Sequence, residues 1–144
     1  DNIAGIKDSS ADIHNLGALC EACGDSGQVV VGAGTHLYPG LEMGATGGII
    51  AVGLLATAAS CELHRVFRAG RSAEAGRLQE RIGPLHKRVV GAIGVPGVKY
   101  GLDLLGLVGG DPRPPLLPVS SRERQDVEAA LEHAGLAGRA TIES

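Results

Sequence analysis

The chain has 144 residues, of which 13 are Lys or Arg and 16 are Asp or Glu, so its formal net charge is -3. This length is sufficient for one domain with a hydrophobic core. The slightly acidic balance argues against the clustered positive charge of a nucleic-acid-binding surface, and an aromatic content of 2% leaves few rings on which bases could stack. We therefore expect no nucleic-acid partner.

The first predicted element is a buried strand over residues 2–7 that ends on a lysine. Side chains of a strand alternate between its faces, so Ile3, Gly5 and Lys7 share one side, and Gly5 leaves room beneath the lysine stem. A poorly solvated ammonium favours the neutral amine, which can attack a carbonyl carbon and form an imine. The pattern equally fits a surface lysine that extends into water. Lys7 is a candidate nucleophile, with the surface interpretation left open.

A helix is predicted from about residue 10 to residue 23, with Ser9 as its N-cap. It carries a CxxC pair, Cys20 and Cys23. The pair could form a redox or metal site, or the two cysteines could simply be small buried residues. A structural zinc site would need a second pair of ligands, and only Cys61 remains. An odd number of cysteines suggests a reducing compartment, which leads us to expect a cytoplasmic protein without a metal site.

A second strand is predicted over residues 28–32, and it ends at Gly32-Ala33-Gly34. The glycines lack the spacing of a dinucleotide-binding fingerprint, and no acidic residue follows a further strand. Their alternative use is the close approach of backbone to an anionic ligand. A short helix over about 36–43 follows.

The third strand is predicted over residues 48–52 and the next helix over 54–69. No charged residue lies between Glu42 and Glu62, but several glycines and threonines interrupt this run. A buried strand followed by the apolar start of a helix explains it better than a membrane-spanning helix, so we expect no membrane contact.

The order up to about residue 70 is strand–helix repeated three times, with strands that are apolar throughout. This order is typical of a parallel sheet covered by helices, in the α/β class. Residues 71–144 change to helices, predicted at about 72–90, 96–105 and 121–134, with Pro84 expected to kink or divide the first of them. The chain thus divides into a β/α region, 1–70, and a C-terminal helical region, 71–144.

Four stretches together resemble the dihydrodipicolinate synthase and N-acetylneuraminate lyase family: GIKDSS, VVVGAG, GATGGIIAV and GVPGVKYGLDLLGLVGGDPRPPL. The resemblance extends from Asn2 to about Leu136, and residues 94–116 also resemble the 4-hydroxy-2-oxoglutarate aldolase branch. It implies the C-terminal half of a (β/α)8 TIM barrel, with strands six to eight followed by C-terminal helices. The chain then reads as an incomplete part of a longer protein.

The resemblance also implies an activity and its residues. Lys7 matches the imine-forming lysine that condenses with pyruvate or another 2-oxo acid. Gly32 falls where the family lines the bound pyruvate with a glycine, and Ile49 where a backbone carbonyl lies near the imine. No cofactor is implied, the small-molecule 2-oxo acid is the expected partner, and a homotetramer is the usual assembly.

The sequence departs from the family where specificity for a second substrate is set. Many members have acidic residues after the glycine, whereas Ala33 and Gly34 follow here, and many have an asparagine near Leu54. The family's threonine pair, proton-relaying tyrosine and carboxylate-binding arginine would all lie upstream of Asp1. Two hypotheses remain: part of a class I lyase or aldolase, which is catalytic in the full-length protein, or a non-catalytic half barrel that serves in folding or assembly.

Overall fold

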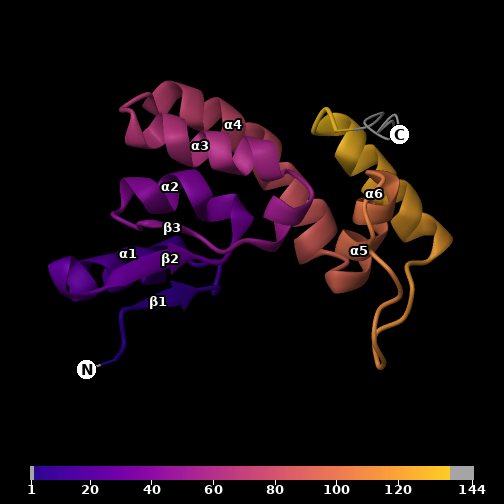
Figure 1. The fold of residues 1–144 in the computed structure, drawn as a ribbon, viewed down its shortest axis with the longest axis horizontal. Helices are drawn as coiled ribbons and strands as arrows, with labels where there is room; N and C mark the ends of the chain where they lie inside the picture. The colour runs from indigo at the N-terminus through magenta and orange to yellow at the C-terminus, as the bar shows by residue number, and fades with distance from the viewer. Residues whose placement is uncertain (1, 137–144) are drawn as a thin grey trace.

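The computed structural model describes residues 2–136. Its sheet contains three parallel strands in the order β1 (Gly5–Asp8), β2 (Gln28–Val31) and β3 (Gly47–Gly48), as Figure 1 shows. The α/β class is confirmed. Each strand lies within or next to its predicted range and is shorter than predicted, and β3 contains only 2 residues.

Each strand is followed by a helix: α1 (Ile13–Cys23), α2 (Leu37–Glu42) and α3 (Thr57–Arg68). Short 3-10 turns precede β2, α2 and α3 at Gly24–Ser26, Gly34–His36 and Ala51–Leu54. One face of β2 carries Val29 and Val31, which form a small hydrophobic core with Leu16 of α1 and with Ala45. This face of the sheet therefore packs against α1.

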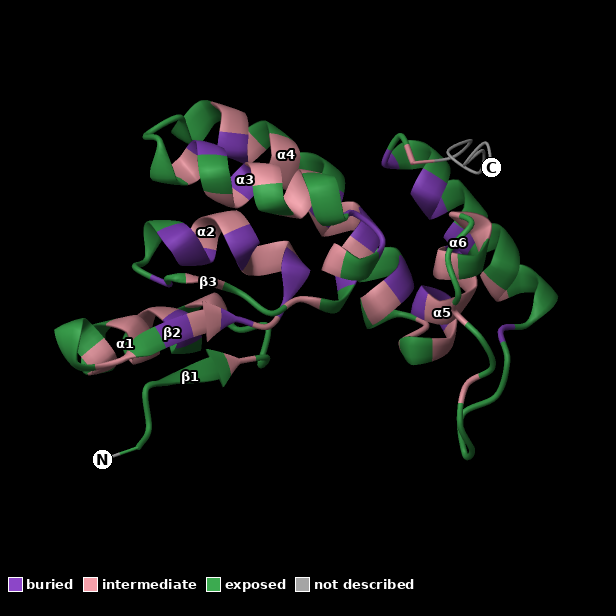
Figure 2. Ribbon diagram, viewed as in Figure 1, coloured by how far each residue is buried: buried purple, intermediate pink, exposed green. Residues whose placement is uncertain are grey.

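The prediction that the first strand is buried is wrong for this chain. Ile3 is 86% exposed and Ile6 is 45% exposed, and all of β1 except its last residue is exposed in Figure 2. The physical reason is position: within residues 2–136, β1 is an edge strand that pairs only with β2, and no element covers its free side.

The start of α1 also differs from the prediction. Asp12, not Ser9, is the N-cap, and its carboxylate accepts hydrogen bonds from the backbone N–H groups of His14 and Asn15. Ala11 has φ +56, a conformation that a right-handed helix cannot contain. The helix therefore begins three residues later than predicted.

The remaining helices are α4 (Ser72–Leu85), a π-helical turn η4 (His86–Gly91), α5 (Val95–Leu104) and α6 (Ser121–His133). Pro84 lies inside α4, and the chain widens into the π turn two residues later. A proline ring clashes with the carbonyl one turn earlier, which accounts for a change of helical pitch at this place. The predicted division at Pro84 is thus realised as a π turn.

A larger hydrophobic core joins α2 and α3 to α4, η4, α5 and α6. It therefore draws on both sides of residue 70, and the division into regions 1–70 and 71–144 stays a prediction. The most deeply buried members, each 0% exposed, are Val52, Leu63, Val66, Ala75, Val89 and Val127. Among the described residues, no helix combines the length and apolar character that crossing a membrane requires.

Candidate functional site

The three strands end side by side, and each contributes a residue to the shared edge. Beyond the end of β2, the Gly32 N–H donates a hydrogen bond of 2.6 Å to the carbonyl oxygen of Asp8. Beyond the end of β3, the Ile49 N–H donates one of 2.8 Å to the carbonyl oxygen of Val31. The three residues singled out from the sequence, Lys7, Gly32 and Ile49, therefore lie along one edge of the sheet, at its carboxyl end.

Lys7 lies on the face of the sheet that turns away from α1. It is opposite Val30 in the parallel register, whereas Val29 and Val31 point into the small core. Side chains at opposing positions of a pleated pair share a face. Lys7 is exposed at this uncovered face.

Gly32 is in close contact with the lysine stem. A Cβ atom at position 32 would meet Ser9 Oγ, and it would lie 2.6 Å from the Asp8 carbonyl oxygen and 2.9 Å from Lys7 Cε. Real Cβ atoms do not approach backbone this closely, so only glycine fits between β1 and the loop that follows β2. The absence of a side chain at Gly32 is what allows the Lys7 stem to pass over the end of β2.

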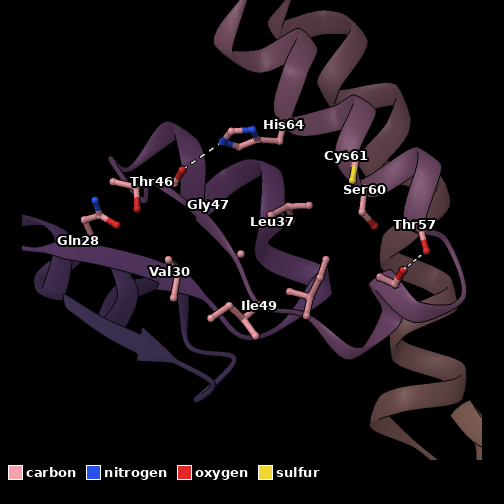
Figure 3. A pocket seen from close by; sticks show the side chains of 13 residues that line it. Gln28, Val30, Leu37, Thr46, Gly47, Ile49, Thr57, Ser60, Cys61 and His64 are labelled. Atoms are coloured by element: carbon pink, nitrogen blue, oxygen red, sulfur yellow. Dashed lines mark hydrogen bonds between the residues drawn. The ribbon is translucent and has the colours of Figure 1, made fainter. Parts of the chain in front are cut away.

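Ile49 also borders a groove of about 780 Å³ that is formed by β2, β3 and α3. Figure 3 shows Ile49 and Val30 on one side of this groove and Cys61 and His64 of α3 on the other. His64 Nε2 lies 3.1 Å from the Thr46 carbonyl oxygen, which ties α3 to the start of β3. Of Lys7, Gly32 and Ile49, which together form the strand-end site, Ile49 alone lines this groove.

The loop after Gly32 is held from behind by two side chains that the sequence analysis missed. The Gly34 N–H donates a hydrogen bond of 3.2 Å to His86 Nδ1. Gln79 donates from Nε2 to the Gly34 carbonyl oxygen at 2.9 Å and accepts at Oε1 from the Tyr38 N–H at 2.8 Å. Helical spacing could have drawn attention to Gln79 and His86 as polar residues on the apolar stripe that includes Ala75, but it could not have identified the backbone groups that they bind.

The cysteine pair does not have the properties of a reactive CxxC motif. Cys20 and Cys23 are free thiols, half-buried against the small core. Burial, followed by the neighbouring Cys23, raises the pKa of the Cys20 thiol. Reactive cysteines need a lowered pKa instead. Between residues 2 and 136, no group of three or more His, Cys, Asp or Glu side chains is arranged to hold a metal ion.

The chain was compared with known proteins. Residues 1–134 match the Dihydrodipicolinate synthetase family. A curated relative, the 4-hydroxy-tetrahydrodipicolinate synthase of Rhodopseudomonas palustris (strain BisA53), is 34% identical over 135 residues, which are 94% of this chain and 46% of the relative. A second relative of that name, from Jannaschia sp. (strain CCS1), is also 34% identical, over 93% of this chain and 46% of the relative. The chain thus spans about half the length of the curated relatives it matches.

Solved structures of dihydrodipicolinate synthases have a similar fold over the matched residues. The dihydrodipicolinate synthase of Thermotoga maritima superimposes with a TM-score of 0.81 at 26% identity, over 94% of this chain and 47% of that one. The chloride-inhibited dihydrodipicolinate synthase of Acinetobacter baumannii, determined in complex with pyruvate, gives 0.84 at 29% identity, over 94% and 46%. Because the family match covers nearly every described residue, the chain belongs to the dihydrodipicolinate synthetase family.

Proposed function

We propose that this chain supplies part of the active site of a class I, imine-forming lyase or aldolase that acts on pyruvate or a related 2-oxo acid. The observation that carries the proposal is the meeting of three strand ends, where Gly32 makes room for the Lys7 stem and Ile49 lies next along the same edge. The proposed activity is most like that of 4-hydroxy-tetrahydrodipicolinate synthase or 4-hydroxy-2-oxoglutarate aldolase. Pyruvate in the related Acinetobacter structure supports the substrate class.

Each residue has a distinct part in the proposed chemistry. The neutral amine of Lys7 attacks the C2 carbonyl of the 2-oxo acid, and loss of water leaves a protonated imine. The imine withdraws electrons, so C3 can lose a proton to give an enamine, and that carbon then bonds to the carbonyl carbon of a second substrate. Gly32 lets the backbone approach the acid, and the Ile49 carbonyl lies near the imine.

The proposal includes an architecture in which the three strands are the last three of a (β/α)8 barrel. Barrel enzymes place their chemistry at the carboxyl ends of the strands, which is where Lys7, Gly32 and Ile49 gather. The face of β1 and β2 that carries Lys7 and Val30 would then point to the barrel axis. Residues for proton transfer and carboxylate binding would come from the half of the relatives' length that this chain does not match. The complete protein would assemble as a homo-oligomer.

The test is reductive trapping in the full-length protein. Pyruvate with borohydride should leave a stable secondary amine on Lys7, detected by peptide mass, because reduction makes the reversible imine permanent. Lys7→Arg should abolish the adduct, since guanidinium stays protonated and is no nucleophile. The matched control is Lys99→Arg, because Lys99 lies in α5 and donates its hydrogen bond to the Gly109 carbonyl at 2.6 Å.

A specific observation favours the second candidate, a non-catalytic assembly module. The open groove beside β3 and the uncovered face of β1 are surfaces on which another part of a barrel could pack. Adduct on Lys99 with Lys7 unmodified would reject the assigned nucleophile. No adduct on any lysine of a correctly folded full-length protein would favour the module.

A further inference from the structure

We propose that Gln79 and His86 are positioning residues that fix the Gly32–Gly34 loop against the end of β1, and that through this loop they set the place of the Lys7 amine. The inference deepens the proposed function and rests on it for its kinetic consequence. Neither side chain reaches the strand-end site itself: they lie behind the loop, in α4 and in the π turn η4.

The hydrogen bonds show how complete this hold is. Gly34 is bound on both sides of its backbone, with its N–H on His86 Nδ1 and its carbonyl on Gln79 Nε2. The same Gln79 amide accepts from the Tyr38 N–H, at the first turn of α2. One glutamine thus fixes both ends of the segment that joins the loop to α2.

The packing leaves Gly34 no space to shift toward Val52 and His86. Gly34 is buried, and a Cβ atom there would meet Val52 Cγ1 and lie 3.0 Å from His86 Nδ1. On its other side the loop is bonded to β1 through Gly32 N–H and the Asp8 carbonyl oxygen. Only Ala33 separates Gly32 from Gly34, so a displacement at Gly34 moves the backbone that lies against the Lys7 stem.

The hydrogen bond from Gly34 requires an unprotonated Nδ1 on His86. Burial, with a smaller effect from the nearby His36, lowers the pKa of His86. The ring is therefore neutral near pH 7, and Nδ1 accepts while Nε2 carries the proton. The Nδ1 acceptor for the Gly34 N–H is therefore present near pH 7.

The test uses full-length protein with four variants and two controls. Gln79→Ala and His86→Ala remove the hydrogen bonds. His86→Asn keeps an acceptor near the position of Nδ1, and Gln79→Glu keeps the acceptor for Tyr38 but loses the donor to Gly34. Controls are Gln125→Ala on α6 and His14→Ala on α1, which are exposed on their helices. The readouts are amide hydrogen exchange at Gly34 and Tyr38, and the rate of borohydride trapping on Lys7 at saturating and at low pyruvate.

We expect the amide that loses its acceptor, Gly34 in His86→Ala and Tyr38 in Gln79→Ala, to exchange about 5- to 10-fold faster, the factor that losing one net hydrogen bond implies. The trapping rate at saturating pyruvate should fall by a similar factor, because the amine is misplaced rather than the acid more weakly bound. His86→Asn should restore both rates, and Gln79→Glu should loosen Gly34 while leaving Tyr38 protected. Both controls should match the wild type.

Wild-type exchange and trapping in the alanine variants would overturn the inference. So would His86→Asn behaving as His86→Ala, because the bulk of the ring rather than its acceptor would then matter. A wild type that forms no adduct at all would reject the proposed function instead. In that case the exchange rates at Gly34 and Tyr38 alone would decide whether the two side chains hold the loop.

Discussion

Gly32 is the residue at which close packing meets the proposed chemistry, so it gives the sharpest single substitution. Gly32→Ala would place a methyl group 2.6 Å from the Asp8 carbonyl oxygen and 2.9 Å from Lys7 Cε. Because a backbone atom cannot yield as a flexible side chain can, we expect the loop to move away from β1. Trapping on Lys7 in the full-length protein should fall at least about tenfold, of the size found when reacting groups are misplaced.

The matched control is Gly76→Ala in α4. Its new methyl group would meet only Tyr38 Cε1 at 3.9 Å, an ordinary van der Waals contact. Alanine is also favoured over glycine inside a helix by about 0.5–1 kcal/mol. This variant should trap as the wild type does and unfold at an equal or higher temperature. Equal trapping in the Gly32 and Gly76 variants would show that the close contact at Gly32 has no bearing on the amine.

The apolar run that ends on Lys7, and a family resemblance at Gly32 and Ile49, pointed to the strand ends but not to the residues that support them. Lys7 ends the predicted strand 2–7, whereas Gly32 and Ile49 were implied by the resemblance, and parallel strands place their carboxyl ends at a common edge. Gln79 and His86 lie more than 40 positions after the Gly34 backbone they hold, and a helical pattern gives no sign of what a polar side chain on an apolar face will meet. Their partners are backbone groups, which every residue has, so the sequence cannot point to them.

At the scale of a single element, α6 has the clearest local determinant of its start. Ser120 Oγ accepts from the Glu123 N–H at 3.3 Å, and the Glu123 carboxylate accepts from the Ser120 N–H at 2.7 Å, which forms a capping box. Ser120→Ala should lower the free energy of unfolding by about 1 kcal/mol at pH 7, the usual contribution of such a cap. Thermal or urea unfolding measures it, with the neighbouring Ser121→Ala as the control.

The effect of this substitution should depend on pH in a defined direction. Hydrogen bonds from the Ser120 side chain and backbone lower the pKa of Glu123 in the folded chain. A carboxyl group with a lowered pKa stabilises the fold above its unfolded-state pKa, and this contribution disappears as the pH falls through the lower, folded value. The difference between wild type and Ser120→Ala should therefore shrink on acidification. A difference that grows toward low pH would contradict this assignment.

Element types were predictable here and element ends were less so. The strand–helix alternation and the helices at residues 72–85 and 121–133 follow from apolar periodicity. The start of α1 does not follow from apolar periodicity, because Ala11 adopts a positive φ and the carboxylate of Asp8 accepts a hydrogen bond from the backbone N–H of Ser10. Such local side-chain bonds compete with helix formation, and several residues before α1 could have provided them.

At the scale of the whole molecule, the exposure of β1 sets the surroundings of Lys7 in this chain. A continuous apolar run predicted a buried strand, because the pattern reflects the environment that a strand is suited to. Within residues 2–136, β1 has only β2 beside it. Pyruvate and borohydride applied to the 144-residue chain should therefore leave far less adduct on Lys7 than in the full-length protein. The exposed amine would be hydrated, and the proton-transfer groups that we propose in the unmatched half of the relatives would be missing.

Peptide mass after equal reaction times measures this difference. The control is Lys99, whose reactivity toward a general amine reagent should be alike in both forms, since its carbonyl partner Gly109 lies within this chain. Equal adduct on Lys7 in the short and the full-length protein would show that the groups in this chain are enough for imine formation.

The two outer strands of the sheet differ, and this difference has a consequence for symmetry. Among residues 2–136, β1 and β3 each pair only with β2, from opposite sides, and all three run in one direction. Two copies that met through their sheets in parallel would have to join the free edge of β3 to the free edge of β1, which is a head-to-tail contact rather than a twofold one. Repetition of such a contact closes into a ring only if the curvature of the sheet completes a full turn, and otherwise it continues as an open filament.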